Sequence, residues 1–300
     1  MSEHALAVSV VIPARNAAAF LDGCLRSVRR QDYPPDRFEI LVADNGSTDG
    51  TAAIARSHGL QPLAVARPGA AAARNAAAAV ARHPLIAFLD SDAEAEAGWL
   101  RHLVAPFQDP GVTIVGGRIE PFRVVTGPET HAAVRGVLKQ QDFLRGFPPY
   151  MLPFAATANA AIRADALRAA DGFDETLRIC EDADLAWRIQ WRGGRLAYAE
   201  DAVVRHHNRS GRREYFRQTF DYGRGTVRLF AKHRRRLGRR VWLDWNLYGE
   251  ILWAVVRLPV APLLARTGWG RVEPLYDLAA GLCFWSGRLC ESAKHKVIAI

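Results

Sequence analysis

Two aspartates separated by one residue, Asp90 and Asp92, follow a short hydrophobic run at residues 85–89. In an extended segment, side chains two positions apart point the same way, so both carboxylates can face one cation. Paired carboxylates with open coordination positions suit Mg²⁺ or Mn²⁺, which bind a few protein oxygens together with substrate phosphates. A solvated acidic turn would explain the pair equally well, but its place directly after a buried run favours a functional site.

Two further charged side chains follow runs of the same kind. Arg74 lies near the start of an alanine-rich segment, where a guanidinium and a helix N-terminus both favour an anion such as a diphosphate. Asp44 begins the turn at residues 44–50 and could accept hydrogen bonds from a base or a ribose. In the same turn, Ser47 or Thr48 can cap the next helix. An ordinary surface arginine and a capped turn are the simpler alternatives.

Three acidic residues open a predicted helix at residues 181–191. Glu181, Asp182 and Asp184 are each stabilised there by the helix dipole, by about 0.3–1 kcal/mol. This stabilisation explains one or two acids, whereas three leave room for a catalytic carboxylate. His206 ends a predicted short strand, where it could complete a metal site or serve the structure alone.

The elements that must position these residues follow a regular pattern in the first ninety positions. Hydrophobic runs predict strands at residues 8–12, 39–42, 63–66 and 85–89, and the segments 17–30, 49–58 and 70–82 are typical of helices. This alternation predicts an open, mostly parallel sheet with right-handed crossovers and helices on both faces. Ligands of such sheets bind beyond the carboxyl ends of the strands, where the polar residues described above are found.

Beyond residue 110 the pattern is less regular. We expect a strand at residues 112–119 interrupted by Gly116-Gly117, an irregular segment at 120–153, a strand within 155–163, helices after Asp165 and at 181–191, and short strands at 195–198 and 202–206. From residue 209 the chain becomes basic, aromatic and helical.

Taken in order along residues 8–225, these motifs resemble those of the family 2 glycosyltransferases with the GT-A fold. The set consists of Ser9-Val10-Val11-Ile12-Pro13-Ala14-Arg15-Asn16, the turn at residues 44–50, Arg74-Asn75, Phe88-Leu89-Asp90-Ser91-Asp92, Asn159, Gly172-Phe173-Asp174-Glu175, Glu181-Asp182-Ala183-Asp184-Leu185 and Tyr222-Gly223. Each motif is modest alone, but the ordered set is specific. The chain departs from the family pattern at Thr157-Ala158 and at Asp171, where the family prefers glycine.

The resemblance implies an α/β fold of the GT-A type, with a Rossmann-like sheet, and a role for each matched residue. Donor-binding residues would be Pro13, Ala14, Arg15, Asn16, Asp44, Arg74, Asp90 and Ser91; metal ligands would be Asp90, Asp92 and His206; acceptor-side residues would be Asn159 and Glu181. Within the donor group, Arg74 would face the phosphates. Asp182 would be the catalytic base. The implied cofactor is a divalent cation, Mn²⁺ or Mg²⁺.

The implied reaction is sugar transfer with inversion, from a UDP-, dTDP- or GDP-linked donor to an acceptor hydroxyl. The cation neutralises the leaving nucleoside diphosphate, and Asp182 takes the proton of the attacking hydroxyl. The acceptor would belong to cell-envelope polysaccharide, glycolipid or lipid-linked glycan synthesis. A non-catalytic nucleotide-sugar-binding protein would keep the fold without turnover, and the presence of both Asp92 and Asp182 argues against it.

The positive charge of the chain is concentrated in one segment. The formal net charge is +9, and residues 205–240 alone hold 13 Arg or Lys against two acids, a net charge of +11. Aromatic and aliphatic residues follow this segment directly, a combination that suits an anionic membrane surface. Packing of these segments on the catalytic domain or a dimer interface is the alternative. A nucleic-acid-binding protein would explain the basic segment but not the polar strand ends, so we expect no nucleic-acid partner.

These observations predict two domains. We expect a catalytic domain at residues 1–208, with a donor half at about 1–118 and an acceptor half at about 119–208, and a basic, amphipathic helical extension at 209–300. The longest apolar stretch, 251–265, is shorter than the roughly 20 residues that span a bilayer. No secretory signal is evident and the four cysteines form no CxxC pair. We therefore expect a cytoplasmic protein, peripheral on the cytoplasmic face of the cell membrane.

Overall fold

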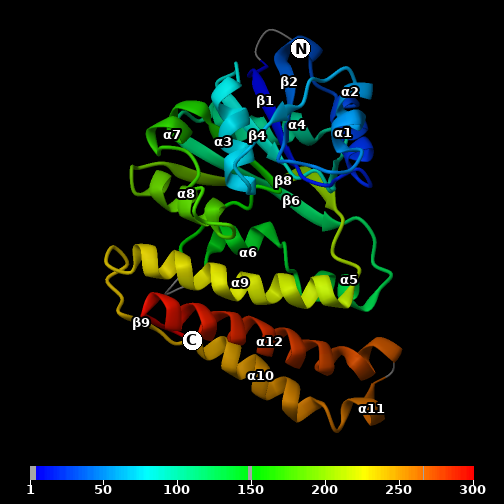
Figure 1. Ribbon diagram of the computed structural model, residues 1–300, viewed down its shortest axis with the longest axis vertical. Helices are drawn as coiled ribbons and strands as arrows, with labels where there is room; N and C mark the ends of the chain where they lie inside the picture. Colours follow the sequence, from blue (N-terminus) through cyan, green and yellow to red (C-terminus); the bar gives the residue numbers. More distant parts are fainter. Residues whose placement is uncertain (1–4, 148–150, 266) are drawn as a thin grey trace. The chain divides into compact units, whose positions relative to one another are not determined.

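The computed structural model describes residues 5–147, 151–265 and 267–300. The chain forms two compact units, which are described separately below (Figure 1). The first takes in the residues up to Phe122 and Leu138–His207, and the second takes in Arg123–Val137 and Asn208–Ile300. The segment Arg123–Val137 thus belongs to the second unit, although it lies inside the range expected for the catalytic domain.

The first half of the sheet in the first unit is parallel. Its strands are β1 (Val8–Ala14), β2 (Phe38–Asp44), β3 (Leu63–Ala64) and β4 (Leu85–Leu89). Their connections contain α1 (Leu21–Arg29), a 3₁₀ turn (Pro35–Arg37), α2 (Thr51–Ser57) and α3 (Ala70–Val80). Strand β1 pairs in parallel with both β2 and β4, and β2 pairs in parallel with β3. Every strand and helix predicted before residue 90 is confirmed, with shifts of a few residues at the ends.

The second half of the sheet mixes the two strand directions. Its strands are β5 (Ala93–Ala95), β6 (Val112–Pro121), β7 (Asn159–Arg163) and β8 (Arg195–His206). Helices α4 (Trp99–Val104), α6 (Gln140–Arg145), α7 (Ala164–Ala169) and α8 (Glu181–Gln190), with a 3₁₀ turn at Ala105–Gln108, complete this unit. Within the described residues the order is β3-β2-β1-β4-β7-β6-β8-β5. Strand β7 runs antiparallel to both of its neighbours, while β6 and β8 are parallel.

Three predictions about the middle of the chain are wrong. Strand β6 runs without interruption through Gly116-Gly117, and β8 is one strand rather than two short ones. Position 117 has no room for a side chain, because a Cβ at Gly117 would lie 2.4 Å from the Ala202 carbonyl oxygen. The ladder between β6 and β8 shifts register beside this glycine. The segment expected to be irregular contains two helices, α6 and, in the second unit, α5 (Gly127–Arg135).

Side chains from the two faces of the sheet pack under different helices. Val8, Val10 and Ile12 are fully buried in one cluster with Leu25 of α1 and Trp99 of α4. Successive side chains of a β-strand point to opposite faces of the sheet, so the residues between these three lie on the other face. Helices therefore cover both faces of the sheet, as predicted.

The second unit is helical. It contains α5, α9 (Arg212–His233), α10 (Trp245–Arg257), α11 (Ala261–Leu264) and α12 (Gly268–His295), with short paired strands β9 (Val241–Trp242) and β10 (Ile298–Ala299). Helices α9 and α12 cross closely where glycines face the partner backbone, since a Cβ at Gly223 would lie 2.1 Å from the Phe284 carbonyl oxygen. Figure 1 shows α10 lying beside α12. Among the described residues, no helix combines the length and hydrophobicity needed to cross a bilayer.

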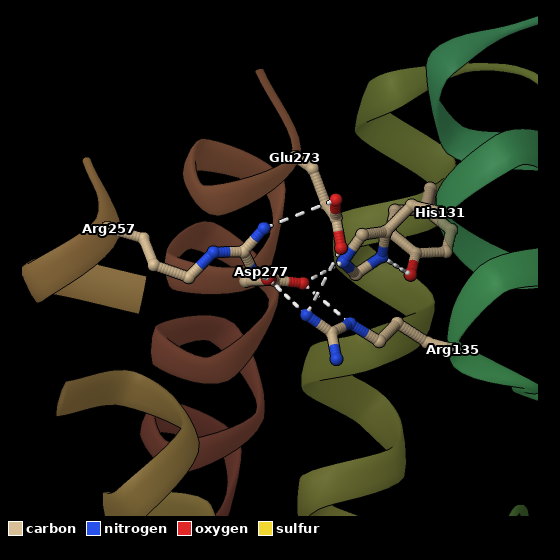
Figure 2. Close-up of polar contacts among 6 residues, drawn as sticks. His131, Arg135, Arg257, Glu273 and Asp277 are labelled. Atoms are coloured by element: carbon tan, nitrogen blue, oxygen red, sulfur yellow. Dashed lines mark hydrogen bonds and ion pairs between the residues drawn. The ribbon is translucent and has the colours of Figure 1, made fainter. Parts of the chain in front are cut away.

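A buried polar cluster joins the helices of this unit (Figure 2). His131 of α5 contacts the Tyr215 hydroxyl at 2.6 Å through Nδ1 and the Asp277 carboxylate at 2.9 Å through Nε2. Arg135 and Arg257 also bind Asp277, from α5 and α10. Burial would raise the pKa of Asp277, but the hydrogen bonds from His131 and Arg135 hold it below its ordinary value. The cluster is a closed ion-pair network that fixes α5 and α10 on α12.

Candidate active site

The carboxyl ends of β1, β2 and β4 carry the residues expected to bind a donor. Asn16, which has a positive φ of 51°, accepts hydrogen bonds from the backbone and hydroxyl of Thr48 and donates its own backbone N–H to Ser47. Asp44 accepts from the Ser47 backbone N–H at 3.0 Å. Arg15 stands exposed beside Asn16. The loops after β1 and β2 are therefore tied together into one rim.

The prediction that Ser47 or Thr48 caps the following helix is wrong. Helix α2 begins after Gly50, which has no side chain to cap it, and Ser47 and Thr48 bind Asn16 instead. Asp49 instead accepts from the backbone N–H and the hydroxyl of Thr51.

Asp90, Asp92 and His206 come together as a group that could hold a metal ion. One ligand atom from each lies within 4.8 Å of the others, and His206 Nε2 is 3.2 Å from Asp92 Oδ1. The pairing of β5 with β8 creates this proximity, because it sets Ala93 opposite His206. The backbone N–H of His207 also donates to the Asp92 carbonyl oxygen at 2.9 Å. The two carboxylates and one imidazole suit a divalent cation and leave positions open for further ligands.

Arg74 forms ion pairs with two acidic side chains, Asp90 and Glu181. Its side chain is 5% exposed, and Nη1 donates to Glu181 Oε1 at 2.6 Å while Nη2 donates to Asp90 Oδ1 at 3.0 Å. Burial opposes the positive charge, but Asp90 and Glu181 outweigh it and raise the pKa of Arg74. Its terminal nitrogens thus bind one metal-ligand candidate and one acid of α8, and the role of Arg74 toward the donor phosphates stays a prediction.

The acids at the start of α8 carry perturbed pKa values. The helix is entered through Cys180, whose φ of 65° turns the chain sharply, and Glu181 follows at once. Burial raises the pKa of Glu181 to about 7, although Arg74 lowers it. Burial also raises the pKa of Asp182, which accepts from the Ala183 backbone N–H at 2.8 Å. Arg74 thus donates a hydrogen bond to Glu181, whereas Asp182 accepts from the backbone.

Asn159, expected on the acceptor side, has a structural role. Its side chain is fully buried, and its amide donates to the carbonyl oxygens of Arg118 and Ala202 at 2.8 Å each. Its carbonyl oxygen accepts from the indole N–H of Trp99 at 2.8 Å. These bonds join β6, β7, β8 and α4, and the acceptor-side role expected of Asn159 stays a prediction.

Two positioning residues lack an assigned role in the sequence analysis. Asn75 binds the backbone N–H and carbonyl of Phe173 and the Glu175 carboxylate, so it holds the loop that leads toward α8. The sequence signal for this positioning role is that Asn75 directly follows Arg74 in the matched motif. His207 stacks on Phe122 with ring centroids 3.9 Å apart and approaches Phe20 at 4.9 Å. No sequence pattern indicated that stack.

Backbone geometry explains why aspartate can occupy position 171, where the family prefers glycine. Asp171 and Gly172 have φ values of 60° and 66°, the left-handed region that glycine favours and aspartate tolerates. A Cβ at Gly172 would lie 2.7 Å from Asn75 Oδ1, so the loop needs glycine there. At Asp171 a side chain is compatible with the same turn.

Comparison with known proteins identifies the family of this chain. A model of glycosyl transferase family 2 matches residues 9–170. The chain is 31% identical over 276 residues to the pre-mycofactocin glycosyltransferase of Mycobacterium tuberculosis, covering 89% of this chain and 55% of that protein. It thus spans about half the length of that relative. It is 29% identical over 301 residues to glycosyltransferase AglE of Haloferax volcanii, covering 95% of this chain and 94% of that protein.

A solved structure shows the same fold. The mannosyltransferase PcManGT of Pyrobaculum calidifontis, in complex with GDP-Man and Mn²⁺, matches with a TM-score of 0.66 at 22% identity. The match covers 96% of this chain and 88% of that one, which confirms the predicted GT-A fold. Because the family model covers more than half of the residues, the chain belongs to glycosyl transferase family 2.

Proposed function

We propose that the chain transfers a sugar, with inversion, from a nucleotide-sugar donor to an acceptor hydroxyl. The observation that carries the proposal is the shared contact of Arg74 with Asp90 and Glu181. This contact holds the candidate metal ligands and the acids of α8 at one edge of the sheet. A site for a diphosphate leaving group and a base for an incoming hydroxyl are both required by such a reaction.

The donor side comprises the strand ends. Asp90, Asp92 and His206 would hold Mn²⁺ or Mg²⁺, which when bound supplies positive charge to the diphosphate of the donor. Pro13, Ala14, Arg15, Asn16 and Asp44 would border the nucleobase and ribose, with Ser91 beside the metal ligands. The match to a mannosyltransferase bound to GDP-Man and Mn²⁺ supports this class of donor, as UDP-, GDP- or dTDP-sugar.

Asp182 is the proposed base. Its pKa is raised by burial, which makes the carboxylate a stronger proton acceptor than an exposed aspartate. As the acceptor oxygen forms its bond to the anomeric carbon, the proton of the hydroxyl passes to Asp182 and the bond from that carbon to the diphosphate breaks. Attack on the face opposite the leaving group inverts the configuration, and no covalent sugar–enzyme intermediate is needed.

The acceptor is proposed to lie at a membrane. The basic and apolar character of the second unit suits the cytoplasmic face of the cell membrane, where a lipid-linked, glycolipid or cell-envelope polysaccharide acceptor would be presented. Donors are made in the cytoplasm, so such a location gives the protein access to both substrates.

The test uses the full chain and a panel of UDP-, GDP- and dTDP-sugars. We expect one donor class to raise the Tm in the presence of Mn²⁺, and slow release of nucleoside diphosphate to accompany it. Asp182→Asn should leave the donor-induced Tm shift nearly intact while turnover collapses. Glu181→Gln is the matched control because it alters the neighbouring acid. Full activity in EDTA, or an active Asp182→Asn beside an inactive Glu181→Gln, would overturn the proposed roles.

A further inference from the structure

Helix α10 turns an apolar side outward. Trp245, Leu252, Trp253 and Val256 are exposed by 72%, 65%, 59% and 54%, and their spacing of seven, one and three residues places them on one side of the helix. Leu247 on the other side is buried. In a helix that faces water, the polar residues occupy the outer side. Here the outer side is hydrophobic, so it is built for a non-aqueous surrounding.

Helix α12 continues this surface. Val272, Leu275, Leu282 and Leu289 are exposed at intervals of three and seven residues, which aligns them along one stripe. Helices α10 and α12 pack together, and Gly281 of α12 is closely approached by the Ile251 side chain of α10. Among the described residues, 13 of the 19 large hydrophobic side chains that are exposed lie between residues 241 and 298. A concentration of this kind marks an interaction surface rather than scattered exposure.

A basic hollow adjoins the start of α10. It has a volume of about 540 Å³ and is lined by Arg234, Arg235, Gly238, Arg239 and Arg240. The hollow lies in the segment between the end of α9 and β9, and only four residues separate Arg240 from Trp245. Guanidinium groups gathered around a hollow favour phosphate, which they bind in a forked geometry.

We propose that α10, α12 and this arginine hollow form one docking surface for an anionic phospholipid bilayer. The arginines bind phosphate headgroups, and the tryptophan and leucine side chains enter the interfacial layer with both helices in the membrane plane. This inference deepens the membrane location given under the proposed function and rests on it. It assigns that location to particular residues and to anionic lipid.

Charge complementarity selects the bilayer over a second copy of the chain. Another copy offers the same apolar side but brings more arginines toward the arginines already present. Glu250 is the only acidic residue in α10, and the acids of α12 (Glu273, Asp277 and Glu291) already pair with arginines of their own chain, so a facing copy supplies little negative charge. An anionic bilayer supplies both the phosphates and the apolar interior.

The test is co-sedimentation of the full chain with vesicles. One set contains phosphatidylcholine alone, and the other contains phosphatidylcholine with phosphatidylglycerol. We expect pelleting with the anionic vesicles only, decreasing as salt is added. Each arginine near an anionic surface strengthens binding about fivefold, so Arg235→Gln with Arg240→Gln should weaken it about 25-fold. Leu252→Ser with Trp253→Ser should weaken it by roughly tenfold or more.

Matched controls change the same residue types elsewhere. Arg56→Gln with Arg168→Gln removes two exposed arginines from the first unit, and Val80→Ser removes an exposed apolar side chain of α3. These variants should pellet like the unchanged protein, and circular dichroism confirms folding of all of them. Nucleoside diphosphate release without vesicles is measured in parallel. Its absence would contradict the proposed transferase function and leave vesicle binding as a separate result.

Two outcomes would overturn the docking surface. Equal pelleting of the Arg235→Gln/Arg240→Gln variant and the unchanged protein would remove the arginine hollow from lipid binding. Loss of a dimer in light scattering by Leu252→Ser/Trp253→Ser, with vesicle binding unaltered, would assign the apolar side to a second copy instead.

Discussion

Replacing Arg74 with methionine distinguishes two roles for this side chain. In the structure Arg74 joins Asp90 to Glu181, so its loss should lower stability and, because a positive charge 3.0 Å from Asp90 Oδ1 is removed, strengthen cation binding. If Arg74 instead serves the donor phosphates, as its motif alone suggests, only donor affinity should fall. Methionine keeps most of the length and apolar volume of the arginine stem, which limits cavity effects.

The magnitude follows from burial. The side chains of Arg74, Glu181 and Asp90 are 5%, 10% and 27% exposed, so water screens the two ion pairs little. Removing one member of a buried ion pair costs about 3–5 kcal/mol, because the remaining charge is left without a partner. Glu181, whose pKa is already about 7, can offset part of this cost by taking a proton. We therefore expect a loss near 3 kcal/mol, or a Tm lowered by roughly 6–12 °C.

Thermal unfolding by circular dichroism and calorimetric titration of Mn²⁺ alone provide the two readouts. Arg74→Lys keeps the charge but lacks the fork that reaches both carboxylates, so it should be intermediate in both. Adding Glu181→Gln to Arg74→Met should recover stability, because the unpartnered acid is then removed. Arg168→Met, at an exposed position, is the control.

An unchanged Tm together with weaker binding of nucleoside diphosphate would refute this reasoning. It would mean that the contacts with Asp90 and Glu181 contribute nothing to stability and that Arg74 acts on the donor. A lowered Tm with unchanged Mn²⁺ affinity would refute only the link to the cation site.

Three further predictions follow from other contacts. Glu181 has a pKa of about 7 in the folded protein, above its ordinary value of 4.5. Its contribution to the free energy of unfolding therefore falls as the pH rises from about 4.5 to about 7. Glu181→Gln should remove this component from a plot of Tm against pH. Asn159→Ala leaves buried partners unpaired at Trp99 and two carbonyls and should cost about 3 kcal/mol or more in denaturant unfolding, whereas exposed Asn246→Ala should cost little. Asp92→Asn should weaken Mn²⁺ binding by more than the roughly 10–100-fold typical of outer-shell partners, and an unchanged affinity in calorimetry would remove Asp92 from the metal site.

The parallel half of the sheet could be predicted because its signals are local. Strands β1 and β4 are buried on both faces and therefore appear as unbroken hydrophobic runs between helices of ordinary length. Because neighbouring strands in this half run parallel, their carboxyl ends lie at the same edge of the sheet. This is why Asp44 and Asp90 could be assigned to one site without any knowledge of distances.

The mixed half could not be predicted because its signals are not local. Gly116-Gly117 looks like a strand break, yet in β6 Gly117 makes room for the Asn159 side chain and the Ala202 carbonyl. That requirement comes from residues more than forty positions away. The same applies to β8, where pairing with β6 and β5 keeps one strand continuous through a register shift.

For Arg74, the sequence predicts the type of side chain at the site but not the contacts that this side chain makes. The motif correctly marks a basic side chain beside the site, but sequence cannot show which way it points. Asp90, Glu181 and Asp182 act on a single buried guanidinium, which cannot balance three carboxylates alone, and Asp92 lies beside Asp90. The remaining charge has to be offset by protons, as the raised pKa values of Glu181 and Asp182 indicate, or by a cation at Asp90 and Asp92. Arg74 is thus the fixed charge that lets the proposed metal ligand Asp90 and the proposed base Asp182 lie close together, whereas the proton and the cation would be exchangeable.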